Sequence, residues 1–472
     1  MLRIKTTDNN CGEVISKECI LEATGEKQEA EEFSEEHYSD LTSFANTPLK
    51  ELVRKNKELL VFPHCLLPED KILDDNTYGK ILDSKILEMY GPKEKPDDVK
   101  ISTGNLMGFV GKGSVRVEIT SRFDKGPKDF FLHYMLLRVF CPNLVKLGSS
   151  ASSGDFLDVL PLMFSHVLRK ALSQGIYKTY RTFERNDANV KGPVNVSRHI
   201  RENIPFCGKI AYRERTRTAD NPLTELVRHT IEFIKQKPFG RGILSHDKDV
   251  RNAVLQITEC TPSYSRQERQ KVVAKNAQPV RHPYFTEWRP LQKLCLAILN
   301  SEKIKYHSDR NNVYGILFDG AWLWEEYVNT IVGKAFYHPK NRSGDGAQYL
   351  FDKSIGRVYP DFIGRDIKNR VIADAKYKPI GNISGDDYLQ VLAYMFRFES
   401  KTGYYLYPET DSKDDRDLRM NRGSTYEKNV TARDDVRVVK RGLKIPEASN
   451  FSDFSNAMRN SEEEFVKALV PV

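Results

Sequence analysis

The chain has 472 residues, of which 39% are hydrophobic and 29% charged, with a formal net charge of +8 and a pI near 8.9. This length is typical of two or three domains, and the composition is that of a globular protein. No apolar run approaches the roughly eighteen residues that span a bilayer, and the N-terminus lacks a secretory signal, so we expect a cytoplasmic protein.

The seven cysteines are odd in number, scattered along the chain and never arranged as C-x-x-C. This argues against a disulfide framework, a structural zinc site and the iron–sulfur cluster of some RecB-like nucleases. The basic charge fits a polyanionic partner, although many housekeeping enzymes are equally basic.

Residues 22–40 are acidic and predict a solvated or connecting segment. Amphipathic helices are predicted within 48–90, followed by a β-hairpin over 104–123 whose strands flank the turn 111–113. The glycines here resemble a phosphate-binding loop, but Ser114 follows Gly113 where that motif requires a lysine. A turn that needs positive φ explains them better, and any NTP hydrolysis belongs to another polypeptide.

The middle of the chain, about 128–300, predicts a largely helical region because apolar residues recur every three or four positions. A shorter basic, β-like stretch interrupts it, and its candidate DNA-binding residues are Arg198, Arg201, Arg213, Arg215 and Arg217. Phosphate contact is one interpretation, since the guanidinium fork matches phosphate oxygens. A solvated face with ion pairs to Glu202, Glu214 and Asp220 is the other. His199 and His229 lack metal-ligand spacing and are interpreted as structural.

The C-terminal third predicts two strands joined by a polar turn, with Asp361 after Pro360 at the first strand and Asp374 and Lys376 in the second. Because side chains in a strand alternate, Asp374 and Lys376 share a face, and hairpin pairing brings Asp361 beside them. Two carboxylates beside an amine predict a Mg²⁺ site for phosphodiester hydrolysis, with Mn²⁺ able to substitute. Lys376 would orient or help deprotonate the water.

A helix over 318–332 carries Glu325 and Glu326 before these strands, and a helix over 385–398 carries Gln390 and Tyr394 after them. Gln390 and Tyr394 share a helix face because they are four residues apart. An acidic helix, a strand with Pro-Asp, a strand with D-x-K and a helix with Q-x-x-x-Y is the ordered signature of PD-(D/E)xK nucleases. One more strand over 401–410, an exposed loop over 411–435, a strand and a last helix complete an α/β domain with a mixed central sheet flanked by helices.

The chain resembles the McrC family, the nuclease subunits of McrBC and LlaJI-type modification-dependent restriction systems. The similar stretches are 102–123, 190–203, 212–230 and 317–328, besides the nuclease core; the first hundred residues match least. The resemblance implies metal binding by Asp361 and Asp374, with Glu325 completing the acidic cluster and Trp324 standing where the family has Phe. It also implies catalysis assisted by Lys376. Gln390 and Tyr394 would position water or the DNA backbone.

This resemblance also implies a division of labour along the chain and with a partner. Residues 1–125 would be a mixed α/β partner-interaction region, 126–305 a mainly helical middle domain and 306–472 a PD-(D/E)xK endonuclease domain. In the McrC family the nuclease docks on a ring of the AAA+ GTPase McrB, stimulates its GTP hydrolysis and cuts DNA that contains modified cytosine. Three alternatives are a stand-alone RecB-like repair nuclease, a catalytically weak activator or scaffold of a partner NTPase, and a DNA-binding structural protein.

Overall fold

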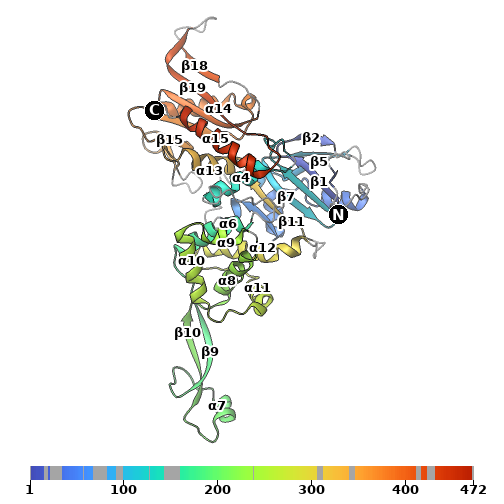
Figure 1. Cartoon of the computed structure of the whole chain (residues 1–472), viewed down its shortest axis with the longest axis vertical. Helices are drawn as coiled ribbons and strands as arrows, with labels where there is room; N and C mark the ends of the chain where they lie inside the picture. Colours follow the sequence, from blue (N-terminus) through green and yellow to red (C-terminus); the bar gives the residue numbers. More distant parts are fainter. Residues whose placement is uncertain are drawn as a thin grey trace. The chain divides into compact units, whose positions relative to one another are not determined.

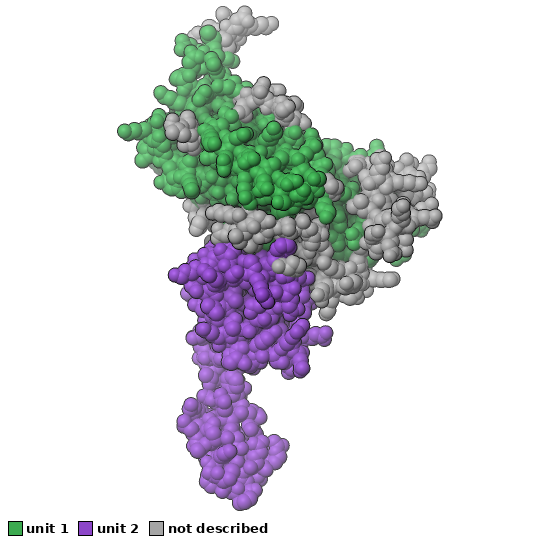
Figure 2. Space-filling view, in the orientation of Figure 1, with its two compact units in different colours: residues 1–162, 302–472 green, residues 163–301 purple. Residues whose placement is uncertain are grey.

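The computed structural model describes residues 2–14, 20–21, 34–56, 58–66, 82–91, 99–126, 128–142, 160–237, 239–305, 312–339, 346–410, 416–422 and 431–469. They fall into two compact units, residues 1–162 with 302–472 and residues 163–301 (Figure 2). Residues 126–162, expected in the middle domain, therefore group with the first unit. The mixture of helices and sheets confirms the α/β class. No helix in the described ranges has the length and apolarity needed to cross a membrane.

The N-terminal sheet of the first unit has six strands. Their order is β3 (Ile20–Leu21), β1 (Leu2–Thr7), β8 (Val115–Thr120), β7 (Leu106–Lys112), β11 (Tyr314–Asp319) and β4 (Leu59–Phe62). The hairpin expected over 104–123 is formed by the antiparallel pair β7 and β8. β11 enters from far along the chain, antiparallel to β7 and parallel to β4. All six of its residues are buried, which explains its continuous apolar sequence.

Smaller elements complete this half of the unit. They are α1 (Glu35–Thr42), α2 (Leu49–Lys55), the 3₁₀ turn η1 (His64–Leu66), and a second sheet of β2 (Cys11–Val14), β6 (Lys100–Thr103) and β5 (Leu87–Tyr90). The prediction of helices within 48–90 is correct only for α2. Leu59–Phe62 and Leu87–Tyr90 are strands instead. Their apolar runs are too short to distinguish strand from helix by periodicity. Of the acidic segment, residues 22–33 lie outside the described residues and 35–42 form α1.

The glycines of the β7–β8 hairpin have a structural reason. Gly113 lies in the turn at φ +54°, and Gly108 lies within β7 at φ +129°. A Cβ on Gly108 would come within 2.0 Å of the Ile316 carbonyl oxygen of β11. Glycine is needed where the backbone takes positive φ or approaches another strand closely, so these residues serve the sheet.

The C-terminal sheet holds the predicted catalytic strands (Figure 1). Its order is β12 (Phe336–Tyr337), β15 (Phe362–Gly364), β16 (Val371–Ala375), β17 (Thr402–Glu409), β19 (Ala432–Lys444) and β18 (Arg416–Asn421). β16, β17 and β19 run parallel while the outer strands are antiparallel, so the sheet is mixed as expected. The exposed loop predicted over 411–435 is wrong for 416–421 and 432–435, which are strand.

Helices and one hairpin surround this sheet. They are α4 (Phe130–Phe140), α13 (Gly320–Val332), α14 (Asp386–Arg397), the 3₁₀ turn η7 (Ile380–Asn382), α15 (Phe451–Leu469) and the pair β13 (Gln348–Phe351) and β14 (Ile355–Val358). α13 begins directly after β11, with Asp319 accepting a hydrogen bond from the Ala321 amide at its N-terminus. The two predicted helices, 318–332 and 385–398, are therefore present as α13 and α14 within two residues of their expected bounds.

The N-terminal sheet contacts the chain just after the predicted catalytic strand, at Tyr377, two residues beyond β16. Ser121 Oγ lies 2.8 Å from the Tyr377 hydroxyl, and the Arg122 guanidinium donates a hydrogen bond to the Tyr377 carbonyl. Asp8 at the end of β1 pairs with Arg122 at 3.4 Å. These buried contacts join residues from three distant parts of the sequence.

The second unit is mainly helical, as predicted for the middle region. Its elements are most of α6 (Leu160–Leu172), α8 (Pro222–Lys235), α9 (Gly240–Ser245), α10 (Lys248–Cys260), η5 (Arg266–Glu268), α11 (Arg269–Lys275) and most of α12 (Trp288–Lys305). A two-stranded ribbon, β9 (Thr179–Asp187) with β10 (Ile210–Thr218), carries α7 (Val196–Asn203) at its far end (Figure 1). We call this ribbon with α7 the arm.

Candidate active site

β16 places Asp374 and Lys376 on one face, as its alternating pattern predicts. Asp374 is 1% exposed, and its Oδ2 lies 2.7 Å from Lys376 Nζ. Asp361 immediately precedes β15, which pairs antiparallel with β16. Its Oδ2 accepts a hydrogen bond of 2.9 Å from the Ala375 amide, which fixes the carboxyl group beside Asp374. The hairpin thus brings together the three residues that the sequence singled out.

Lys376 is surrounded by acceptors. Three oxygen atoms lie within 3.2 Å of its Nζ: Asp374 Oδ2 at 2.7 Å, Gln390 Oε1 at 2.9 Å and Asp387 Oδ1 at 3.2 Å. Burial lowers the pKa of Lys376, but the charges of these carboxylates outweigh it, and the net pKa is raised above that of an ordinary lysine. In this structure Lys376 is therefore an ammonium ion, which suits it to orient a water or neutralise charge rather than to accept a proton.

The carboxyl groups repel one another. Desolvation raises the pKa of Asp361 well above its ordinary value, and the charges of Asp374 and Glu325 raise it further. Desolvation also raises the pKa of Asp374, while Lys376 and a hydrogen bond with Asp361 oppose the rise. Glu325 is therefore close enough to Asp361 for its charge to act on that carboxyl group. The cluster is an environment in which added positive charge is strongly favourable.

Hard oxygen donors of this kind fit Mg²⁺, which needs only one or two carboxylates besides water and phosphate. Asp374 Oδ2 is buried and paired with Lys376, yet it accepts no well-directed hydrogen bond from the described residues. No group of three His, Cys, Asp or Glu side chains in the described ranges is already arranged to enclose a metal. The carboxylates of Asp361 and Asp374 therefore fit the ion. Glu325 is not arranged with them as a third ligand in this structure.

His338 is a site residue that the sequence did not reveal. Its Nδ1 lies 2.9 Å from the Asp361 carbonyl oxygen and its Nε2 lies 3.7 Å from Glu325 Oε1. The ring stacks on Phe362, with 5.1 Å between centroids. His338 directly follows the two-residue strand β12. No spacing motif accompanies it, so only the tertiary structure could find it.

α14 supports the lysine from one face, as the Q-x-x-x-Y spacing predicts. Gln390 Nε2 donates to the Tyr394 hydroxyl at 2.8 Å, and that hydroxyl donates to the Tyr359 carbonyl at 3.4 Å. Tyr394 is buried, and its hydroxyl holds Gln390 in place. In this structure Tyr394 fixes the amide that contacts Lys376, and its role in DNA contact stays a prediction.

The comparisons with known proteins can be set against this geometry. The family model described as "McrBC 5-methylcytosine restriction system component" matches residues 101–408, a range that includes every site residue named above. The chain belongs to this McrBC family. No curated protein matches the sequence.

Two solved structures contain similar chains, both from Thermococcus gammatolerans. One, a half-complex from a tetradecameric assembly of McrB AAA+ hexamers with bound McrC, is 14% identical, with 99% of both chains covered and a TM-score of 0.49. The other, a cryo-EM structure of the McrBC complex, is 13% identical, with 71% of this chain and 89% of that chain covered and a TM-score of 0.32.

The five arginines expected to contact DNA lie on the arm of this McrBC-family chain. Three of them are ion-paired: Arg198 with Glu202 at 2.9 Å and Glu184 at 3.6 Å, Arg201 with Glu202 at 3.8 Å, and Arg213 with Glu184 at 3.6 Å. Glu214 and Asp220, the other expected partners, pair instead with Arg185 and Arg181. Ion pairs of the kind that the alternative interpretation expects are thus present on the arm, and phosphate contact by the five arginines stays a prediction.

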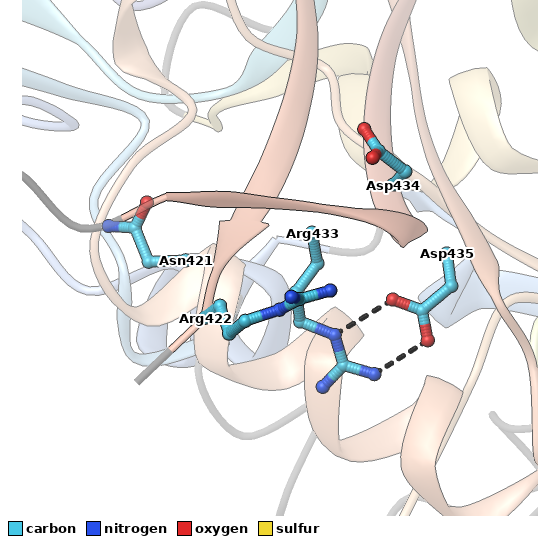
Figure 3. Close-up of a pocket in the computed structure, with 5 residues that line it drawn as sticks. All are labelled: Asn421, Arg422, Arg433, Asp434 and Asp435. Atoms are coloured by element: carbon cyan, nitrogen blue, oxygen red, sulfur yellow. Dashed lines mark hydrogen bonds and ion pairs between the residues drawn. The ribbon is translucent and has the colours of Figure 1, made fainter. Parts of the chain in front are cut away.

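A separate hollow of about 390 Å³ lies on β18 and β19, lined by Asn421, Arg422, Arg433, Asp434 and Asp435 (Figure 3). Figure 3 shows Arg433 turned toward Asp435, with which it forms two hydrogen bonds of 2.7 and 2.9 Å. None of the site residues lines it. Because Arg433 and Asp435 neutralise each other's charge, the side chains that line the hollow do not indicate a class of ligand.

Proposed function

We propose that the chain is the Mg²⁺-dependent DNA endonuclease subunit of a McrBC-type restriction system. The observation that carries the proposal is the convergence of Asp361, Asp374 and Lys376 on adjoining strands, with Gln390 against the lysine. A PD-(D/E)xK nuclease needs this set in this order. A structural ion pair would need neither the second aspartate nor the glutamine.

In this proposal Asp361 and Asp374 hold Mg²⁺, or Mn²⁺ in its place, with Glu325 as a further carboxylate. The ion, when bound, supplies charge neutralisation at the phosphate and a water of lowered pKa. Lys376 donates hydrogen bonds to the water or to a phosphoryl oxygen and so stabilises the charge that develops there. Gln390 keeps the ammonium aimed, and Tyr394 keeps Gln390 in place. The strands are paired beforehand, so the groups need little rearrangement.

Family membership supports the choice of partner and substrate. A McrBC-type subunit would work with a McrB-like AAA+ GTPase ring, stimulate its GTP hydrolysis and cut DNA that contains modified cytosine. Such a subunit would act on DNA in the cytoplasm. No nucleotide-binding motif was found in this sequence, consistent with a partner that supplies the GTPase.

On the arm, Arg215 and Arg217 are the better candidates for DNA contact. Both are exposed on one face of β10, and neither has a carboxylate partner among the described residues; Arg215 packs over the Tyr180 ring at 4.9 Å. We infer that these two, rather than the paired arginines, would contact phosphate. Replacing both by Gln should weaken DNA binding and flatten its salt dependence.

The test is cleavage of cytosine-methylated and unmethylated plasmid by the full chain, with and without its cognate AAA+ GTPase, in Mg²⁺ or EDTA. We expect cutting only with methylated DNA, Mg²⁺, GTP and the partner together. Asp374→Asn and Lys376→Met should abolish it, while the matched variants Asp366→Asn and Lys368→Met in the exposed β15–β16 turn should cut normally. Cutting by Asp374→Asn would place the active site elsewhere.

The same assay separates the alternatives. Efficient cutting of DNA ends without nucleotide or partner would identify a stand-alone RecB-like nuclease. Stimulated GTP hydrolysis with no cutting by the wild-type chain would identify an activator or scaffold. DNA binding with neither activity would identify a structural DNA-binding protein.

A further inference from the structure

Asp387 is a carboxylate of the site that the D-x-K and Q-x-x-x-Y patterns do not include. It is the second residue of α14, and its side chain is 13% exposed. Its Oδ1 lies 3.2 Å from Lys376 Nζ, and its Oδ2 lies 3.1 Å from Lys378 Nζ. The largely buried Lys376 and the half-exposed Lys378 therefore share the carboxylate of Asp387.

The position of Asp387 on α14 matches that of the residues already assigned to the lysine. Asp387, Gln390 and Tyr394 are spaced i, i+3 and i+7, so they form one row along the helix. The first two contact Lys376 Nζ, and the third holds Gln390. The start of α14 is itself fixed, because the Tyr405 hydroxyl donates to the Asp387 carbonyl and Lys440 Nζ donates to the Ile383 carbonyl at 2.7 Å.

An ammonium group has three N–H donors, and three acceptors surround this one. Asp387 and Gln390 come from the helix, whereas Asp374 comes from the strand and is one of the proposed metal ligands. Two of the three acceptors of Lys376 thus belong to α14, Gln390 through a hydrogen bond and Asp387 through an ion pair, and the third is the carboxylate where metal, water and phosphate would meet. With only one helical anchor, the flexible lysine side chain could rotate about it.

We propose that Asp387 is a positioning residue for Lys376, forming with Gln390 a two-point clamp that directs the remaining N–H toward the reacting phosphate. This inference rests on the proposed nuclease function. A plain helix-capping role is the rival explanation, since Ser384 donates its amide to Asp387 Oδ2 at 3.3 Å and acidic residues favour helix N-termini. The two explanations differ in what they predict for Lys378, which touches Asp387 but is not part of the clamp.

The experiment compares Asp387→Ala, Asp387→Asn and Lys378→Met with the wild-type chain in the full complex with its GTPase. For Asp387→Ala we expect kcat for cleavage to fall roughly 10- to 100-fold, as for loss of residues that orient ligands of a catalytic centre. KM for DNA and the half-saturating Mg²⁺ concentration should stay within about twofold, as expected when only transition-state stabilisation is lost. Asp387→Asn, which keeps an acceptor oxygen, should recover part of kcat, and Lys378→Met should cut normally.

Each outcome decides between the explanations. Unchanged kcat in Asp387→Ala, or an equal loss in Lys378→Met, would overturn the clamp. A fall in kcat accompanied by a matching fall in the melting temperature and in DNA affinity would make Asp387 a helix cap only. Absence of Asp374-dependent cutting by the wild-type chain would overturn the nuclease function, and with it the role of Asp387; normal wild-type cutting with an unaffected Asp387→Ala would remove the clamp alone.

Discussion

Glu462 of α15 joins three helices of the first unit through one buried carboxylate. It accepts hydrogen bonds from the Tyr327 hydroxyl of α13 at 2.7 Å and the Tyr134 hydroxyl of α4 at 3.0 Å, and it pairs with Arg138 of α4 at 2.8 Å. α13 is also the helix that carries Glu325. Removing this carboxylate should therefore loosen the support beneath the acidic side of the site.

The expected loss of stability can be worked out from the polar groups that Glu462→Ala leaves without a partner. Glu462→Ala leaves two buried hydroxyls and a largely buried guanidinium without their acceptor. Breaking a buried pair by removing one partner costs about 3–5 kcal/mol, and each unsatisfied buried hydroxyl costs about 1–3 kcal/mol. These terms overlap, so we expect a loss of about 4 kcal/mol in the free energy of unfolding, or a fall of roughly 6 °C in Tm for a unit of this size.

Differential scanning calorimetry of the two variants Glu462→Ala and Glu463→Ala checks this value. Glu463 is the exposed neighbour on the same helix, and its loss should change stability by less than about 0.5 kcal/mol. Tyr327→Phe should destabilise the wild type by about 1 kcal/mol but restore about 1 kcal/mol in the Glu462→Ala background, because there it removes a buried hydroxyl that has lost its acceptor. Equal Tm values for the two alanine variants, or additive effects of Tyr327→Phe, would refute the reasoning.

Three further outcomes are expected. Mg²⁺ at about 100 times its Kd should stabilise the wild type by about 2.7 kcal/mol and Asp374→Asn not at all, as measured by thermal shift; equal shifts would argue against binding at Asp374. Desolvation raises the pKa of Asp129 to about 7 and of Asp8 to about 6, so the folded state holds protons that the unfolded state releases. The free energy of unfolding without metal should then fall by about 3 kcal/mol from pH 5.5 to 7.5 in urea titrations, and a rise would contradict this sign. Gly108→Ala should abolish cooperative thermal unfolding of the N-terminal sheet, because its Cβ would collide with β11; a Tm within 2 °C of wild type would contradict the close approach.

The parts of the site that were predictable from sequence are those set by local periodicity. Asp374 and Lys376 share a strand face, and Gln390 and Tyr394 share a helix face, because strand and helix repeats place them there. The short turn from β15 to β16 then leaves few ways to place Asp361. What the sequence lacked was any sign of His338 and Asp387, since neither belongs to a repeating pattern. Both reach the site only through the packing of α13, β12 and α14.

The secondary structure likewise depends partly on local sequence and partly on strand partners that lie far along the chain. The run Leu59–Phe62 is read as helix when it is taken with the helical residues before it, yet it forms β4 because β11 offers a parallel partner. Strand pairing over some 250 residues cannot be inferred from either segment alone. Likewise β18 lies in a strongly charged sequence, and it is strand because β19 provides an antiparallel edge. Charged residues are tolerated there because an edge strand is exposed to water.

The pairing of β11 with β4 and β7 also indicates that the proposed catalytic region is not a separate domain. β11 completes the centre of the N-terminal sheet and runs directly into α13, so a fragment that began near residue 306 would leave a fully buried strand without either neighbour. At the other end of the site, Tyr377 is buried by Ser121 and Arg122, one residue after the lysine that the mechanism requires. Strand β11 and the Tyr377 contacts thus tie the active-site strand and the acidic helix to the N-terminal sheet. For this chain the arrangement of Asp361, Asp374 and Lys376 therefore depends on the whole first unit, and the order of motifs along residues 318–398 describes only the part that carries the proposed catalytic groups.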